Sequence, residues 1–317
     1  MILTVTMNPS VDIGYQLEQF HLDDVNRVAD VSKTAGGKGL NVTRVAHDLS
    51  LEVMATGILG GTIGGYITRQ LTEQGIRHRF YQIEQESRNC IAILHEGKQT
   101  EILESGPTIS PQEAEGFLAH FKKLLDEEPV KVLTISGSLP KGLTPAIYKQ
   151  MIQIANQKEI PVVLDTSGPT LEAVLADPTL RIAALKPNRD ELSALEKQEL
   201  SHNPLEWKEI LESKRYQQIE WLIISMGGAG AFAKHGTDYY RVQIPAITVV
   251  NPVGSGDATV AGIAKGLAQQ LSPEELLKTA MTTGMLNTME QATGSVNPVL
   301  FDEYFEKVSV TIVKEGV

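Results

Sequence analysis

The chain has 317 residues, 42% of them hydrophobic, a single cysteine (Cys90) and a formal net charge of −11 at pH 7. A chain of this length buries a large core, and we expect one large domain with a small accessory piece. The acidic balance argues against a nucleic-acid surface, because phosphate backbones attract clustered Lys and Arg. A small phosphorylated ligand remains compatible, since a few local cations and backbone N–H groups can hold it.

Three further observations concern the cellular location. One cysteine excludes an intramolecular disulfide framework, and the N-terminal residues ILTVTM read as a strand rather than as a secretion signal. A membrane needs roughly 18 or more consecutive apolar residues, and the sequence has no such run. We therefore expect a cytoplasmic protein without membrane or nucleic-acid partners.

After the first strand, residues about 10–33 and about 78–105 read as half-exposed strands separated by turns, which predicts a small β-sheet. Later, short apolar runs alternate with stretches of helical periodicity. The runs lie at 131–135, 161–164, 182–185 and 221–224, and the helical stretches at 110–127, 145–158 and 190–200. This alternation predicts βαβ units and a mostly parallel sheet covered by helices on both faces. With no linker or repeat, residues 1–317 are expected to form one domain, in which the small sheet is an insertion.

The sharpest local motif is the run Gly254, Ser255, Gly256 and Asp257, between a strand-like segment at 247–250 and a helix expected at 258–268. Glycines at a helix start direct several N–H groups toward one point, which makes an anion site beside a carboxylate. Phosphoryl transfer uses this pairing: the N–H groups stabilise charge and the carboxylate accepts a proton at an ordinary pKa of ~4. Alone, the motif also fits an ordinary turn whose Asp is favoured by the helix dipole.

A second glycine-rich segment holds Gly36, Gly37, Lys38 and Asn41. Glycine allows close backbone approach to a ligand, while Lys38 and Asn41 supply a cation and a bidentate polar group. The segment is not a Walker A loop, because Gly39 follows the lysine where that motif requires Ser or Thr. A flexible turn with a solvated lysine is the alternative.

Further polar residues follow predicted strands, where ligands bind in open α/β sheets. Asp12 comes soon after the first strand, Arg88 lies at the edge of the small sheet, and Ser136 and Ser138 end a central strand. Each has a plain alternative as a turn or surface residue. As a set they provide a carboxylate for sugar hydroxyls and cations for a phosphate.

A third group is expected at the nucleotide end. Lys186, Asn188 and Glu191 follow the apolar run at 182–185, and Asn188 and Glu191 would project to one side of a helix start. Their oxygens suit Mg²⁺ or its waters, and a capping arrangement is the compatible alternative. Ser225, Gly227 and Gly230 form a glycine-rich turn after a strand, a weak signal for nucleotide binding.

The order of these motifs along nearly the whole chain resembles the PfkB/ribokinase family of carbohydrate kinases. The resemblance implies a three-layer α/β/α domain whose small sheet is a lid, with ATP as phosphoryl donor and Mg²⁺ as metal. It assigns the base to Asp257, the anion hole to the segment 254–257, and the sugar phosphate to Asp12, Gly37, Lys38, Asn41 and Arg88. Adenine would lie near the turn at 225–230 and Asn287, and many members form dimers through their lids.

Within the family, TMNPSVD, TAGGKGLNVTRV, SRNCIAIL and NPVGSGDATVAG resemble the branch that phosphorylates ketohexose phosphates. That likeness favours tagatose 6-phosphate as the acceptor, with fructose 1-phosphate as the alternative. A sugar-phosphate-binding regulatory protein without catalysis is the rival from another class, because a fold alone does not establish function.

Overall fold

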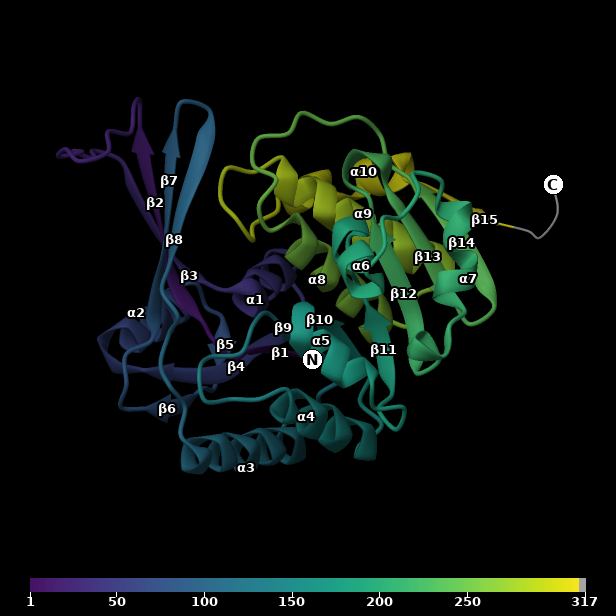
Figure 1. The fold of residues 1–317 in the computed structure, drawn as a ribbon, viewed down its shortest axis with the longest axis horizontal. Helices are drawn as coiled ribbons and strands as arrows, with labels where there is room; N and C mark the ends of the chain where they lie inside the picture. Colours follow the sequence, from purple (N-terminus) through teal and green to yellow (C-terminus); the bar gives the residue numbers. More distant parts are fainter. Residues whose placement is uncertain (314–317) are drawn as a thin grey trace.

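The computed structural model describes residues 1–313, which contain one large and one small β-sheet (Figure 1). The large sheet has eleven strands in the order β15-β14-β13-β12-β11-β10-β9-β1-β4-β5, with β6 also paired to β4. Pairing is parallel from β5 and β6 through to β12, and antiparallel from β12 to β15. The strands are β1 (Ile2–Thr6), β4 (Val53–Gly60), β5 (Arg77–His78), β6 (Tyr81–Ile83), β9 (Val132–Ser136), β10 (Val162–Asp165), β11 (Ile182–Leu185), β12 (Ile219–Ser225), β13 (Ala231–His235), β14 (Asp238–Gln243) and β15 (Ser309–Ile312).

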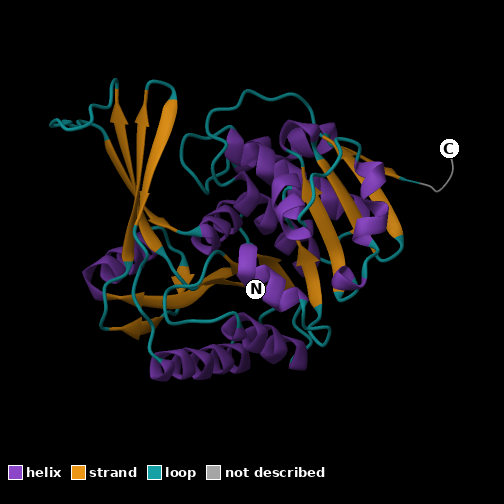
Figure 2. Cartoon of the chain, viewed as in Figure 1, coloured by secondary structure: helices purple, strands orange, loops and turns teal. Residues whose placement is uncertain are grey.

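Helices cover both faces of this sheet, which gives the three layers that the alternating pattern predicts (Figure 2). Successive strand residues point to opposite faces, so Val132 and Leu133 of β9 belong to different cores. One core contains α3 (Pro111–Glu127), α4 (Ala146–Gln157), α5 (Gly168–Leu175), α6 (Arg189–Glu196) and α7 (Lys208–Leu211). The other contains α1 (Lys38–Asp48), α8 (Ser255–Ala268), α9 (Pro273–Thr288) and α10 (Phe301–Lys307), and α2 (Gly61–Glu73) packs in a third cluster.

The small sheet projects from the body of the molecule (Figure 1). Its order is β3-β2-β7-β8, with β2 at Ser10–Leu17, β3 at Val31–Gly36, β7 at Arg88–His95 and β8 at Lys98–Leu103. The sheet therefore begins its second half at Arg88 rather than at about residue 78. The segment before Arg88 forms β5 and β6, which pair with β4 of the large sheet instead.

The prediction of a strand at 247–250 is wrong. These residues form an irregular segment in which Val249 and Val250 are more than half exposed. The backbone N–H of Val250 donates to the Thr288 carbonyl at the end of α9, at 2.8 Å, instead of joining a ladder. A β-branched run predicts a strand only where a neighbouring strand edge is within reach.

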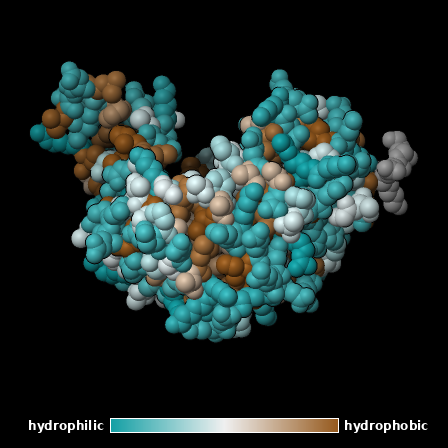
Figure 3. Space-filling model, turned by 60° about the horizontal axis from the view of Figure 1, so that its bottom comes forward, coloured by the Kyte–Doolittle hydropathy of each residue, from teal (hydrophilic) through white to brown (hydrophobic). Residues whose placement is uncertain are grey.

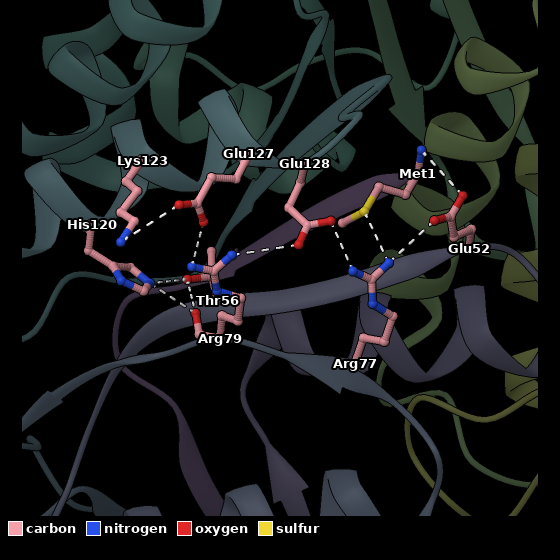
Figure 4. A network of polar contacts seen from close by, with 9 residues as sticks. All are labelled: Met1, Glu52, Thr56, Arg77, Arg79, His120, Lys123, Glu127 and Glu128. Atoms are coloured by element: carbon pink, nitrogen blue, oxygen red, sulfur yellow. Dashed lines mark hydrogen bonds and ion pairs between the residues drawn. The ribbon is translucent and has the colours of Figure 1, made fainter.

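A network of ion pairs joins α3 to the edge of the large sheet (Figure 4). Arg77 contacts Glu52 at 3.3 Å and Glu128 at 2.9 Å, and Arg79 contacts Glu127 at 2.8 Å. These groups lie where β4 and β5 begin, at the opposite ends of the strands from the candidate site. Because most of the side chains are partly exposed, each pair contributes little to stability. Among the helices of residues 1–313, none is long and apolar enough to cross a membrane.

Candidate active site

The carboxylate of Asp257 lies in the first turn of α8, behind an N-cap at Gly254 with φ +84°. That left-handed conformation favours glycine, and a Cβ at this position would lie 2.7 Å from a methyl group of Thr293. The free N–H groups of the helix start and the helix dipole both favour an anion here. Asp257 itself is buried.

Burial raises the pKa of Asp257 to about 7, and the nearby charge of Asp165 adds to the shift. Asn41, which donates to the Asp257 carboxylate at 2.6 Å, and the cations Lys38 and Lys186 act in the opposite direction. The expectation of an ordinary pKa near 4 is therefore wrong, because the sequence does not reveal how completely the side chain leaves water. A carboxylate with a pKa near neutrality is a suitable general base.

Lys38 opens α1 directly after Gly37, whose φ of +102° again requires glycine. Its ammonium pairs with Asp165 at 3.2 Å. Burial opposes the charge on Lys38, but Asp165, Asp257 and Glu191 together hold its pKa above the ordinary value. Asp165 was not predicted from the sequence, although it ends β10 at the carboxyl edge of the sheet, where a polar residue after an apolar run is the available signal.

A cavity of about 300 Å³ lies between the small sheet and the carboxyl ends of β1, β9 and β10. Five of the predicted residues line it, namely Gly37, Lys38, Arg88, Ser136 and Ser138. The remaining lining residues are Thr6, Asn8, Leu103, Gly137, Thr166, Ser167 and Thr170. The cavity thus combines two cations with several hydroxyl groups.

Three buried polar atoms on the cavity wall have no hydrogen-bond partner within residues 1–313: Thr6 Oγ1, Asn8 Oδ1 and Ser136 Oγ. Buried polar atoms are nearly always paired, and an unpaired one costs about 1–3 kcal/mol. A ligand rich in hydroxyl groups would satisfy them. Ser136 was predicted as a site residue from the sequence, whereas Thr6 and the Asn8 side chain were not.

On the paired strands β2 and β7, Ser10 is opposite Arg88 and Asp12 is opposite Cys90, so Asp12 lies diagonally from Arg88. Asp12 accepts from Ser10 at 2.6 Å and packs over Gly36, where a Cβ would lie 2.0 Å from the carboxyl carbon. Burial raises the pKa of Asp12. Arg88 donates to the backbone carbonyls of Asn8 and Glu104, each at 3.1 Å, which anchors its guanidinium at the mouth of the cavity.

The predicted nucleotide residues gather at the ends of β11 and β12. Lys186 is buried beside the start of α8, where a Cβ at Gly256 would lie 3.3 Å from its Nζ. Asn188 and Glu191 form a reciprocal capping box, so the capping arrangement is present. Asn188 forms a parallel bridge with Ser225, which brings the turn at 225–230 beside it.

Asn287 is fully buried and both ends of its amide are used. It donates to the Val253 carbonyl and accepts from the Gly294 N–H, each at 2.9 Å. In this arrangement it supports the loop that carries Gly254. Its contact with adenine stays a prediction.

The donor set is compatible with Mg²⁺. No cluster of three or more acidic, His or Cys ligands occurs in the described part of the chain. Mg²⁺ commonly keeps several waters and binds through one or two carboxylates and substrate phosphates. Asn188 and Glu191 each engage the backbone through one side-chain oxygen, so Glu191 retains an oxygen for such a role.

The fold and this site are those of a phosphotransferase of the α/β class, with a glycine-capped helix start, a buried carboxylate and a polar cavity. The profile of the pfkB family carbohydrate kinases matches residues 5–300, and the chain belongs to this family. The predicted family and fold class are therefore confirmed. The chain is 53% identical over 310 residues to the tagatose-6-phosphate kinase of Staphylococcus epidermidis, covering 98% of this chain and 99% of that one.

Solved structures have the same fold. Phosphofructokinase-2 from Escherichia coli, in complex with substrates and products, matches with a TM-score of 0.86 and 26% identity over 96% of this chain and 98% of that one. The tetrameric inhibited form of the same enzyme matches with a TM-score of 0.85 and 25% identity over the same shares. Membership of the family implies ATP as the phosphoryl donor.

Proposed function

We propose that this kinase transfers the γ-phosphoryl group of ATP to the C1 hydroxyl of D-tagatose 6-phosphate, giving D-tagatose 1,6-bisphosphate and ADP. The observation that carries the proposal is the polar cavity lined by Lys38 and Arg88, because the charge of Lys38 also acts on the buried Asp257 at a helix N-terminus. The 53% identity to a tagatose-6-phosphate kinase over nearly the whole chain supports the choice of acceptor.

In this reaction Asp257 is the general base. A bond forms between the acceptor oxygen and the γ-phosphorus as the bond to the β,γ-bridging oxygen breaks, and the hydroxyl proton passes to Asp257. The N–H groups at the start of α8 stabilise negative charge on the transferring group. Lys38 and Lys186, whose charges act on Asp257, favour its ionised form before it accepts the proton.

The acceptor is proposed to occupy the cavity of about 300 Å³. Arg88 and Lys38 are assigned to its 6-phosphate, because charge-assisted contacts are the strongest available for an anion. The hydroxyl groups are assigned to Asp12, Asn8 and Ser136, two of which carry unpaired buried oxygens. The acceptor would thereby satisfy groups that cost free energy when unpaired.

ATP is proposed to lie toward Lys186 and the turn at 225–230, with Mg²⁺ held through Asn188 and Glu191, in part by way of water. When bound, Mg²⁺ neutralises charge on the phosphates. The chain's own contribution at this end is positional: Lys186 is buried beside Gly256 and lies close to where the phosphates would meet the helix start. An ATP-dependent kinase with one cysteine fits a cytoplasmic location.

Comparative kinetics test the acceptor. We expect kcat/KM for tagatose 6-phosphate to exceed that for fructose 6-phosphate and for fructose 1-phosphate. A preference for fructose 1-phosphate would reassign the chain to the alternative activity, and absence of ATP turnover with all three sugars would favour the non-catalytic binding protein.

The small sheet is proposed to act as a lid and as a dimer surface. Apolar surface gathers on this projecting part (Figure 3), where Ile102 is 53% exposed. Pairing with the same sheet of a second copy would cover it. We expect a homodimer by light scattering, and increased protection of residues 88–103 from hydrogen exchange when sugar phosphate binds. A monomer under all conditions would contradict the dimer, and unchanged protection would contradict the lid.

A further inference from the structure

Arg44 is a cation inside the protein core. It lies on α1 and is 8% exposed, deeper than a guanidinium normally sits. Burial lowers its pKa, while the charges of Asp12, Asp48 and Asp257 favour its protonated form. Arg44 does not line the cavity of about 300 Å³. A buried charge of this kind needs an explanation in its contacts.

Those contacts join three parts of the site. Arg44 Nη2 donates to Asn41 Oδ1 at 2.6 Å and to the Thr293 carbonyl at 2.9 Å, and Nη1 donates to the Ala35 carbonyl. Ala35 belongs to β3 of the small sheet. Thr293 precedes Gly294, whose N–H donates to Asn287. Asn287 also supports the loop before α8 through the Val253 carbonyl.

The contact with Asn41 determines which way its amide faces. A guanidinium has donors and no acceptor, so Asn41 must present its oxygen to Arg44. The amide nitrogen then faces the other way and donates to Asp257 Oδ2 at 2.6 Å. With the amide reversed, its oxygen would face the carboxylate of Asp257 and repel it.

We propose that Arg44 is a positioning residue, which holds the Asn41 amide in the orientation that stabilises ionised Asp257 and ties this arrangement to the small sheet at Ala35. The inference rests on the proposed role of Asp257 as base. The other charged groups that face Asp257 are Lys38 from α1, Asp165 from β10 and Lys186 after β11. Within residues 1–313, none of these three groups forms a hydrogen bond with the Asn41 amide, whose oxygen accepts from Arg44 and whose nitrogen donates to Asp257.

The direct test is a titration of Asp257 in the ligand-free protein, by NMR of ¹³C-labelled aspartate carboxyl groups with the signal assigned from Asp257→Asn. In Arg44→Met we expect the pKa of Asp257 to rise by about one unit or more, because the carboxylate loses its oriented donor. Arg44→Lys keeps a group that only donates, so in this variant the pKa of Asp257 should rise by no more than about half as much as in Arg44→Met. Arg215→Met, at a structural arginine bonded to Glu196 away from the site, is the matched control and should leave the titration unchanged.

Two measurements separate the relay from a simple loss of positive charge. In an Asn41→Ala background, Arg44→Met should add little further shift, whereas full additivity would overturn the relay. In the pH profile of kcat, the acid limb should move to higher pH in Arg44→Met, with KM for tagatose 6-phosphate changed less than about threefold. Should Arg44→Met fail to fold, Arg44→Gln serves in its place, since its amide can also accept and so releases the constraint on Asn41.

An unchanged Asp257 titration in a folded Arg44→Met or Arg44→Gln protein would overturn the proposal. The titration needs no substrate, so its failure is distinct from failure of the proposed kinase reaction, which is judged by turnover of the wild-type protein.

Discussion

Replacement of Asp257 by Asn should stabilise the protein above neutral pH while removing most of its activity. In the folded protein Asp257 keeps its proton up to a pKa of about 7, whereas the ordinary value is 3.8. Between pH 3.8 and about pH 7 unfolding releases a proton, so the free energy of unfolding falls as pH rises. Above about pH 7 the folded protein bears the full cost of the ionised, buried carboxylate. The Asn side chain has nearly the same shape and never ionises.

The pKa difference sets the size of the effect. At about 1.4 kcal/mol per unit, the step from 3.8 to about 7 corresponds to up to about 4 kcal/mol at pH 8.5. For a chain of this size that gain raises the thermal midpoint by roughly 5 °C. At pH 5 the folded wild-type carboxyl is still protonated, and the folded states of the two proteins are then nearly equivalent. The variant's gain should therefore shrink as pH falls from 8.5 toward 5.

Thermal unfolding of both proteins at several pH values between 5 and 8.5 measures the effect, with Asp238→Asn at the exposed start of β14 as the matched control. In parallel, kcat of Asp257→Asn should fall by roughly 10² to 10⁴, the usual contribution of a positioned base. A gain in midpoint that is the same at every pH, or a less stable variant at pH 8.5, would refute the account of Asp257 as a buried carboxylate. Retention of most of the activity would remove it from the mechanism.

Four further substitutions test separate parts of the site. Lys38→Met and Arg88→Met should each raise KM for the sugar phosphate by roughly 10- to 100-fold, with KM for ATP nearly unchanged, since a lost charge-assisted contact costs about 1.5–3 kcal/mol. An increase confined to KM for ATP would assign both residues to the nucleotide. Gly254→Ala should lower kcat and destabilise the fold by about 1–3 kcal/mol, because φ is +84° and a Cβ would lie 2.7 Å from a threonine methyl; near-normal kinetics would argue against the anion hole. Asn188→Ala should raise KM for ATP and cost about 1 kcal/mol through its lost cap, whereas Ser110→Ala, which breaks the capping box of α3, should cost stability alone.

Much of the fold followed from local patterns. The apolar runs and the helical stretches lie within a few residues of β9 to β12 and of α3, α4 and α6. The capping box at Asn188 and Glu191 was also available from the sequence, because its partners are three residues apart. The run at 247–250 did not form a strand, since strand formation depends on a partner edge that local propensity does not describe.

The sequence by itself determined the class of fold, the family and the positions of the glycine-rich motifs, because periodicity and short motifs are encoded by neighbouring residues. Only the tertiary structure decided the electrostatics of the site. Lys38 meets Asp165 across 127 positions and Asn41 meets Asp257 across 216. The raised pKa of Asp257 and the buried guanidinium of Arg44 arise from desolvation and from contacts between segments far apart in the chain, and these exist only once the layers have packed.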